Sequence, residues 1–162
     1  MTPTSFSVEI LPHRDPAVAN QIHELLQAAY KVEGRLLGLD DFPPLRRTRW
    51  QILGAPGCFY GYLENGALLG VAEIEFEDDS RVADIASFVV APASFRRGVG
   101  QDLVRRVLRE MKGVVTAVTV STATANAPAL GLYRKCGFRF QNNWQHDADI
   151  AMVTLVHDLT GA

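Results

Sequence analysis

The sequence has few of the features that define several common classes of protein. Only two of its 162 residues are cysteines, Cys58 and Cys136, and neither lies in a CxxC or CxxH pattern. This spacing predicts no metal site, and it favours a pair of reduced thiols over a disulfide. No apolar run reaches the length that spans a membrane, and residues 1–10 lack the basic and apolar regions of a signal peptide. We therefore expect a cytoplasmic protein without a membrane partner.

The sequence also lacks a strong excess of either charge. Sixteen lysines and arginines stand against 18 aspartates and glutamates, for a net charge of −2. Such a balance provides no general attraction to nucleic acid, so we expect no nucleic-acid partner. Hydrophobic residues make up 48% of the chain, which is typical of a globular protein with a core. The length predicts one domain, residues 1–162.

Hydrophobic periodicity and turn residues predict an α/β fold. Asp15-Pro16 is a typical helix start, Asn65-Gly66 predicts a tight hairpin, and residues 78–80 predict a turn. The expected strands are residues 6–10, 58–63, 67–76, 85–90, 114–120, 138–141 and 150–157, and the expected helices are 16–33, 45–53, 99–111 and 127–136. This order favours a mixed, mostly antiparallel sheet with helices on both faces.

One junction between a strand and a helix predicts an anion site. The apolar stretch 85–90 ends before Pro92, and a helical pattern starts at Val99, directly after Arg96-Arg97-Gly98. The first N–H groups of a helix have no partner within it and bear partial positive charge, so a phosphate is a natural ligand there. Glycine at positions 98 and 100 allows a ligand to approach the backbone.

Two well-known phosphate motifs do not match this junction. A P-loop requires Gly-Lys-Ser/Thr, whereas Gly100 is followed by Gln101 and Asp102. The dinucleotide-binding fingerprint requires a third glycine, and position 103 is leucine.

Two motifs resemble those of the GCN5-related N-acetyltransferases (GNAT family). The stretch from Val89 to Gly100, VVAPASFRRGVG, is similar to the family's acetyl-coenzyme A motif, Gln/Arg-x-x-Gly-x-Gly/Ala. The stretch from Asn126 to Phe138 is similar to its second motif, Asn-x-x-Ala-x-x-Leu-Tyr-x-x-x-Gly-Phe. One position departs from the pattern, since Phe95 replaces the usual Gln or Arg, so the site would keep its backbone donors and lose one side-chain contact.

The resemblance implies a fold with splayed central strands and a reaction in which an amine attacks acetyl-coenzyme A directly in a ternary complex. It implies that Tyr133 is the general acid for the leaving thiolate and that the backbone N–H of Val90 binds the developing oxyanion. Asn126 would contact the cofactor and also cap a helix. The full set of implied cofactor-binding residues is Phe88, Val89, Val90, Arg96, Arg97, Gly98, Val99, Gly100, Asn126 and Tyr133.

The residue that accepts the amine's proton is left open among three carboxylates. We expect Glu73 ahead of Glu75 and Asp84, because Glu73 would lie deeper in the sheet. The competing interpretation of Glu73 is a solvent-facing carboxylate on a strand.

By the resemblance, residues 30–50 and 141–149 would form the acceptor site. Its loop contains Asp40 and Asp41, which could hold an ammonium, and Arg46, Arg47 and Arg49, which could hold a carboxylate or phosphate. We expect a small-molecule amine acceptor, with a protein or peptide acceptor and a catalytically silent acyl-coenzyme A-binding module as alternatives. The sequence leaves a homodimer open.

Overall fold

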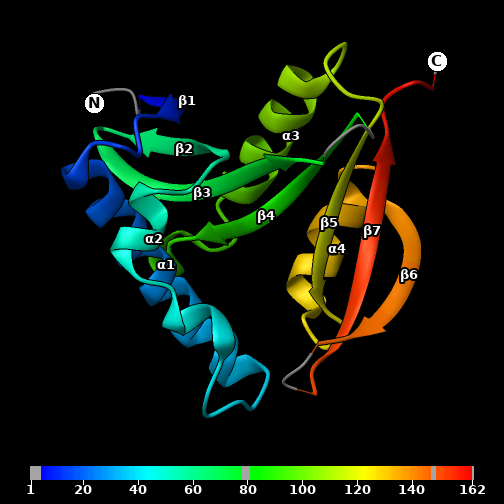
Figure 1. Ribbon diagram of the computed structural model, residues 1–162, viewed down its shortest axis with the longest axis horizontal. Helices are drawn as coiled ribbons and strands as arrows, with labels where there is room; N and C mark the ends of the chain where they lie inside the picture. The colour runs from blue at the N-terminus through cyan, green and yellow to red at the C-terminus, as the bar shows by residue number, and fades with distance from the viewer. Residues whose placement is uncertain (1–4, 78–80, 147–148, 162) are drawn as a thin grey trace.

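The computed structural model describes residues 5–77, 81–146 and 149–161 of the chain, so the predicted turn at 78–80 lies outside the described residues. Seven strands form one sheet in the order β1-β2-β3-β4-β5-β7-β6 (Figure 1). Among the strands of this described part, only β4 and β5 pair in parallel, and the other five neighbouring pairs are antiparallel. The strands are β1 Phe6–Leu11, β2 Cys58–Glu64, β3 Ala67–Phe76, β4 Val82–Val90, β5 Ala117–Ala123, β6 Arg139–Gln145 and β7 Ala151–Asp158.

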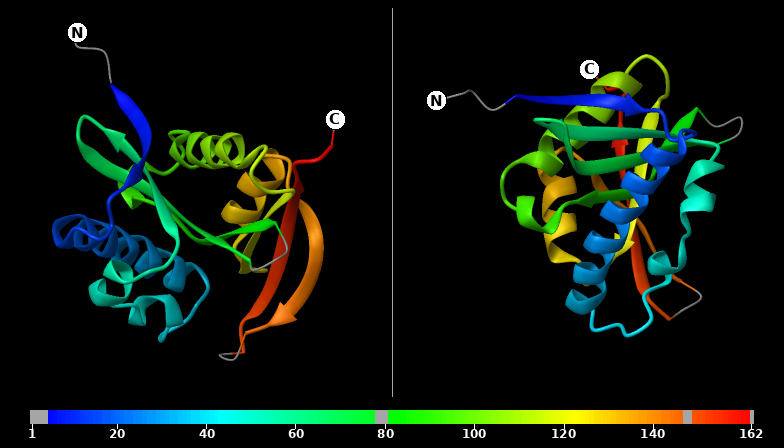
Figure 2. Two further views of the ribbon diagram at one scale, coloured as in Figure 1. Left: turned by 45° about the horizontal axis from the view of Figure 1, so that its top comes forward. Right: turned by 90° about the vertical axis from the view of Figure 1, so that its left-hand side faces the viewer.

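Helices cover both faces of the sheet, as the sequence predicts. Figure 2 shows α1 and α2 on one side of the sheet and α3 and α4 on the other. The helices are α1 Pro16–Leu36, α2 Arg49–Leu53, α3 Val99–Met111 and α4 Ala127–Lys135, with short 3-10 turns η1 Pro43–Arg46 and η2 Pro92–Ser94. The predicted caps are confirmed for two helices: the side chain of Asp15 accepts from Ala17 N–H, and that of Asn126 from Ala129 N–H.

The sheet separates two hydrophobic cores, because successive side chains of a strand point to opposite faces. On β2, Phe59 packs against α1 and α2, whereas Tyr60 packs against α3. Helix α3 presents an apolar stripe to the second core, including the fully buried Leu103 and Val107.

Strand β4 contains a bulge that reverses its facing. Glu73 pairs with Ser87 but Ile74 pairs with Ile85, so Ala86 is an extra residue on β4. Before the bulge Ile85 faces α3, whereas after it Ser87 faces the α1 side. Phe88 then returns to the side of α3 and α4.

Strands β4 and β5 also separate at this point. Their parallel pairing runs only from Val82 with Ala117 to Ile85 with Val120, and the two strands then diverge (Figure 1). The splayed central strands implied by the resemblance are therefore present, and they open a gap bordered by β4 residues 86–90 and β5 residues 121–123.

Several predicted element boundaries differ from the structure by about three residues or more, and three of the differences have an identifiable reason. Val114 and Val115 are not in a strand, because they follow Gly113 in a turn where Val115 N–H bonds to the Met111 carbonyl. Val115 is nevertheless buried, so its β-branched side chain reflects burial and not strand structure. The predicted helix 45–53 is divided into η1 and α2, since Thr48 caps α2 with a reciprocal Gln51 contact. Strand β6 extends to Gln145, and its exposed polar residues lack a periodic pattern.

Candidate active site

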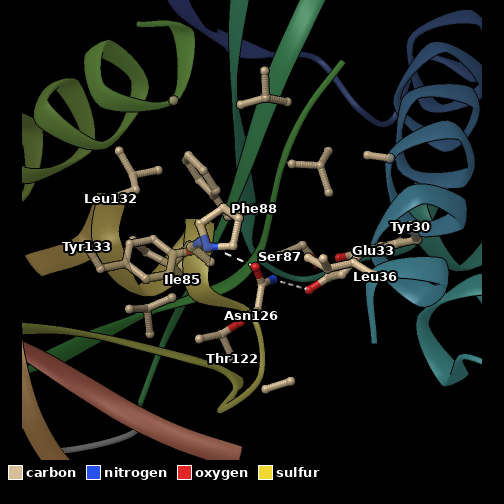
Figure 3. A pocket seen from close by; sticks show the side chains of 18 of the residues that line it. Tyr30, Glu33, Leu36, Ile85, Ser87, Phe88, Thr122, Asn126, Leu132 and Tyr133 are labelled. Carbon is tan, nitrogen blue, oxygen red and sulfur yellow. Dashed lines mark hydrogen bonds between the residues drawn. The ribbon is translucent and has the colours of Figure 1, made fainter. Parts of the chain in front are cut away.

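The gap between β4 and β5 opens into a cleft of about 790 Å³. Its walls come from α1, the β4 residues after Ile85, the loop before α3, the end of β5 and helix α4. Figure 3 shows Tyr30 and Glu33 of α1 on one side and Leu132 and Tyr133 of α4 on the other. We call the wall formed by α3, α4 and β4 the donor wall, and the wall formed by α1, Phe42 and η1 the acceptor wall. The names refer to the acetyl donor and the amine acceptor that the resemblance implies, and not to hydrogen bonds.

The predicted anion site lies at one end of the donor wall. Gly98 is the N-cap of α3, with φ of +83°, and no side chain caps the helix. The next three N–H groups, of Val99, Gly100 and Gln101, are thus available to a ligand, and all three residues line the cleft. The φ of +65° at Arg96 turns the chain into this loop.

The two predicted arginines differ in their placement. Arg96 lines the cleft, but Arg97 does not, and its guanidinium instead donates to both carboxylate oxygens of Glu64 at 2.9 and 3.0 Å. The Arg97 guanidinium therefore already has a partner outside the cleft, whereas Arg96 lines it. Phe95, which departs from the family pattern, lines the cleft and is 47% exposed.

Gly100 lies in close contact with side chains of α4 and β4. A Cβ atom at Gly100 would lie 3.1 Å from Leu132 Cδ2 and 3.4 Å from Val90 Cγ2. A side chain there would fill the narrow space that leads from the helix start towards Tyr133. Phe88, Val89 and Val90 line the same passage, on the part of β4 that has no partner in β5.

Tyr133 is buried in the donor wall between two aromatic rings. Its ring centroid lies 5.8 Å from that of Phe88 and 5.7 Å from that of Phe138. Burial raises the pKa of Tyr133 far above its ordinary value, with the Glu33 carboxylate contributing to the rise. The hydroxyl is therefore a hydrogen-bond donor at any physiological pH.

Glu33 is the carboxylate that the sequence interpretation missed. Among the residues that the structure describes, it is the only acidic one that lines the cleft. Asn126 Nδ2 donates to Glu33 Oε1 at 2.7 Å, and this bond links the two walls (Figure 3). Burial raises the pKa of Glu33, and the Asn126 hydrogen bond opposes that rise. The spacing of Ile22, Leu26 and Tyr30 could have identified it, since position 33 continues the buried stripe of α1.

Glu73 has a different environment from the one that the sequence suggests. Its side chain is 1% exposed, so the solvent-facing interpretation is wrong. Arg47 donates to both carboxylate oxygens, at 2.6 and 2.8 Å, and Ser87 Oγ donates at 2.8 Å. The carboxylate does not line the cleft. Arg47, one of the predicted acceptor-binding arginines, is paired with Glu73 through these contacts.

The other two predicted bases also lie outside the cleft. Glu75 is exposed near the end of β3, and Asp84 accepts a hydrogen bond of 2.7 Å from Thr119 Oγ1. Asp41 pairs with Arg46 in the solvent and likewise does not line the cleft. The two predicted acceptor segments do contribute, through residues of 30–44 and through His146.

Comparisons with known proteins agree with this architecture. The model of the acetyltransferase (GNAT) family matches residues 19–138, and the chain therefore belongs to this family. The UPF0157 protein YqkA of Bacillus subtilis (strain 168) is 33% identical over 132 residues, which cover 82% of this chain but only 38% of the relative.

Two solved structures show the same fold. One is the ribosomal-protein-S18-alanine N-acetyltransferase from Escherichia coli, with a TM-score of 0.75 and 16% identity over 98% of this chain and 96% of that one. The other is the PaiA N-acetyltransferase from Thermoplasma acidophilum in complex with coenzyme A, with a TM-score of 0.74 and 14% identity over 93% of this chain and 98% of that one. Within the described ranges, no helix is long and apolar enough to cross a membrane, and no three potential metal ligands gather.

The pairing of Glu73 with Arg47 predicts a structural role that stability measurements can test. Glu73→Gln should lower the free energy of unfolding by about 3 kcal/mol, because it leaves the half-buried Arg47 without a counter-charge. Glu75→Gln, on the same strand but exposed, should change it by less than about 0.5 kcal/mol. Urea unfolding measures both, and adding Arg47→Met to Glu73→Gln should recover part of the loss. Equal effects of the two glutamine variants would contradict the assignment.

Proposed function

We propose that this protein is an acetyl-coenzyme A-dependent N-acetyltransferase whose acceptor is a small-molecule amine. The observation that supports it most is the arrangement along one cleft. A helix N-terminus with free N–H groups lies at one end, and Tyr133 and Glu33 face the interior from opposite walls. An acyl carrier with a phosphate-bearing tail requires an anion site for the tail and a hydrogen-bond donor near its thioester. An amine acceptor requires a base on the other side of the thioester.

The donor wall fits coenzyme A in its charge and its shape. The N–H groups of Val99, Gly100 and Gln101, together with the Arg96 side chain, would hold the pyrophosphate. The unpaired edge of β4 at residues 88–90 would accompany the narrow, amide-rich pantetheine arm. Acetyl-coenzyme A would supply the acetyl group, and its sulfur would keep the electron pair of the broken C–S bond.

Glu33 is the residue best placed to take the proton of the acceptor. A primary amine has a pKa near 10, so it is mostly an ammonium at neutral pH and must lose a proton before its nitrogen can form the C–N bond. A partly buried carboxylate attracts the ammonium and, with a raised pKa, is a better proton acceptor than an exposed one. This reasoning moves the role expected for Glu73 to Glu33, since the oxygens of Glu73 are occupied by Arg47 and Ser87.

Tyr133 would serve the leaving group from the opposite wall. The amine nitrogen gives up two protons in the whole reaction: one passes through Glu33 to solvent, and the other balances the proton that the sulfur takes up. Because the pKa of Tyr133 lies far above that of a thiol, about 8.5, hydrogen-bond donation to the sulfur is more favourable than complete proton transfer.

The two adjacent arginines test the donor site. Arg96→Ala should weaken the binding of coenzyme A about tenfold, because a charge-assisted contact to phosphate is lost. Arg97→Ala should leave binding within about twofold, because Arg97 is paired with Glu64 outside the cleft. Isothermal titration with coenzyme A and with 3′-dephospho-coenzyme A measures both variants. An equal loss in the two variants would argue against the placement of the pyrophosphate.

Tyr133→Phe tests whether the protein is an enzyme or a silent binding module. The phenyl ring preserves the packing with Phe88 and Phe138, so coenzyme A affinity should be retained, whereas kcat should fall about 10²–10⁴-fold. Tyr60→Phe, in the same core but away from the cleft, is the matched control. Unchanged turnover of the Tyr133 variant would exclude this residue as the donor.

The hydrogen bond between Asn126 and Glu33 predicts a pH effect with a defined sign. Activity requires Glu33 in its ionised form. We therefore expect kcat/KM to be low at a pH below the raised pKa of Glu33 and to increase as the pH rises through that pKa. Asn126→Ser keeps a capping oxygen for α4 but removes the donor that lowers this pKa, so the acidic limb should move to higher pH. The groups that face Glu33 are Tyr30 and Tyr133, both protonated in this range because their pKa values are raised. An acidic limb that stays in place would exclude Glu33 as the titrating base.

A further inference from the structure

The chemistry of the acceptor wall narrows the class of amine that the cleft can take. We propose that the acceptor is a primary amine joined to an apolar body that bears no carboxylate, such as an arylalkylamine or alkylamine. This inference rests on the proposed function and specifies the acceptor of the same site.

The acceptor wall is apolar over almost its entire length. Phe42 and Tyr30 are 7% and 9% exposed and meet edge to face, with ring centroids 5.8 Å apart. Leu36 is 55% exposed and lies at the open part of the wall. The larger apolar side chains on this wall are Tyr30, Val32, Leu36, Phe42, Pro43 and Pro44. Such a surface favours a hydrocarbon or aromatic body and offers few partners to a polar one.

Glu33 is the charged group of this wall, and it is held in place. Its Oε1 accepts from Asn126 Nδ2 at 2.7 Å, and Asn126 is itself fixed by the bond from Ala129 N–H. One carboxylate, oriented from the opposite side and aimed into an apolar cleft, is suited to one ammonium.

Among the described residues, no lysine or arginine of the acceptor wall is available for a carboxylate on the acceptor. Arg46 and Arg47, which follow Pro43 and Pro44 in the chain, are paired with Asp41 and Glu73, and neither lines the cleft. Lys31 and Arg35 of α1 are exposed outside it. The arginine and lysine that do line the cleft, Arg96 and Lys135, belong to the loop before α3 and to α4, on the donor side. His146 also lines the cleft, from the end of β6 and outside the acceptor wall, where its ring contacts that of Trp144. Residues 1–4, 78–80, 147–148 and 162 contain no lysine or arginine.

The same wall disfavours an amine with a second positive charge. Within the described ranges, Glu33 is the sole carboxylate of the cleft, so a second ammonium placed against the described residues of this wall would lie on an apolar surface without a partner. The wall also disfavours an amino acid as the acceptor, because the carboxylate of the amino acid would be buried beside the carboxylate of Glu33. An uncompensated charge in an apolar site is strongly rejected.

The test uses pairs of amines that differ by one charged group. Release of free thiol from acetyl-coenzyme A is followed with the full chain for phenethylamine against phenylalanine, and for hexylamine against 1,6-diaminohexane. We expect kcat/KM for phenethylamine to exceed that for phenylalanine at least about 100-fold, and hexylamine to exceed the diamine at least about tenfold. A peptide with a free N-terminus, Phe-Gly-Gly, is assayed beside them.

Two substitutions connect the selectivity to the wall. Glu33→Gln should lower kcat/KM for phenethylamine at least about 100-fold, whereas Glu24→Gln, on the exposed face of the same helix, should leave it unchanged. Pro44→Arg places a cation on the acceptor wall and should reduce the preference for phenethylamine over phenylalanine about tenfold or more. Thermal unfolding of each variant confirms that it is folded, and a change in a ratio of two substrates is not produced by a loss of stability.

The outcomes separate this inference from the proposed function. Preference for the apolar monoamines, with the ratio shifted by Pro44→Arg, supports it. Turnover of phenylalanine, the diamine or the peptide at or above that of the apolar amines overturns it but leaves an N-acetyltransferase. Binding of acetyl-coenzyme A with no turnover of either apolar amine overturns it as well. If titration shows no binding of acetyl-coenzyme A, the proposed function and the inference both fail.

Discussion

The separation of β4 from β5 is the constraint on which the site depends. The two strands can pair only as far as Ile85 and Val120, because the extra residue Ala86 then changes the facing and direction of β4. After the bulge, Ser87 contacts Glu73 on the α1 side of the sheet and Phe88 contacts Tyr133 on the α4 side. One extra residue therefore determines which side chains of β4 face each side of the sheet. A regular ladder would bury the edge of β4 and close the cleft.

Two carboxylates on the same side of the sheet take different roles because their partners differ. Glu73 accepts three hydrogen bonds from a guanidinium and a hydroxyl, and these join the residue after η1 to the sheet. Glu33 receives one neutral amide donor, so it remains available to a ligand, and burial raises its pKa. The depth of Glu73 made it the preferred candidate in the sequence, but depth without an open approach indicates a structural ion pair.

Local chemistry was predictable where a residue's role depends on its neighbours in the chain. The hairpin at Asn65-Gly66 is present, with both residues at positive φ, and Gly137 takes the left-handed conformation that ends α4. The start of α3 at Val99 and the Asn126 cap follow from the same kind of evidence. Predictions of element boundaries were wrong where an apolar pattern reflects burial by distant elements, as at Val115. They were also wrong where an exposed strand such as β6 has no alternation of apolar residues.

Sequence patterns were sufficient to predict the mixed sheet with helices on both faces, the helix start with its two glycines, and the helix that carries Asn126 and Tyr133. These are local features, since caps, turns and periodicity involve residues a few positions apart. The tertiary structure alone decided which charges are available. Arg47 and Glu73 are 26 residues apart, Arg97 and Glu64 are 33 apart, and Glu33 and Asn126 are 93 apart. Such pairs form only when the sheet brings their elements together, and they determine which side chains of the cleft remain free to act.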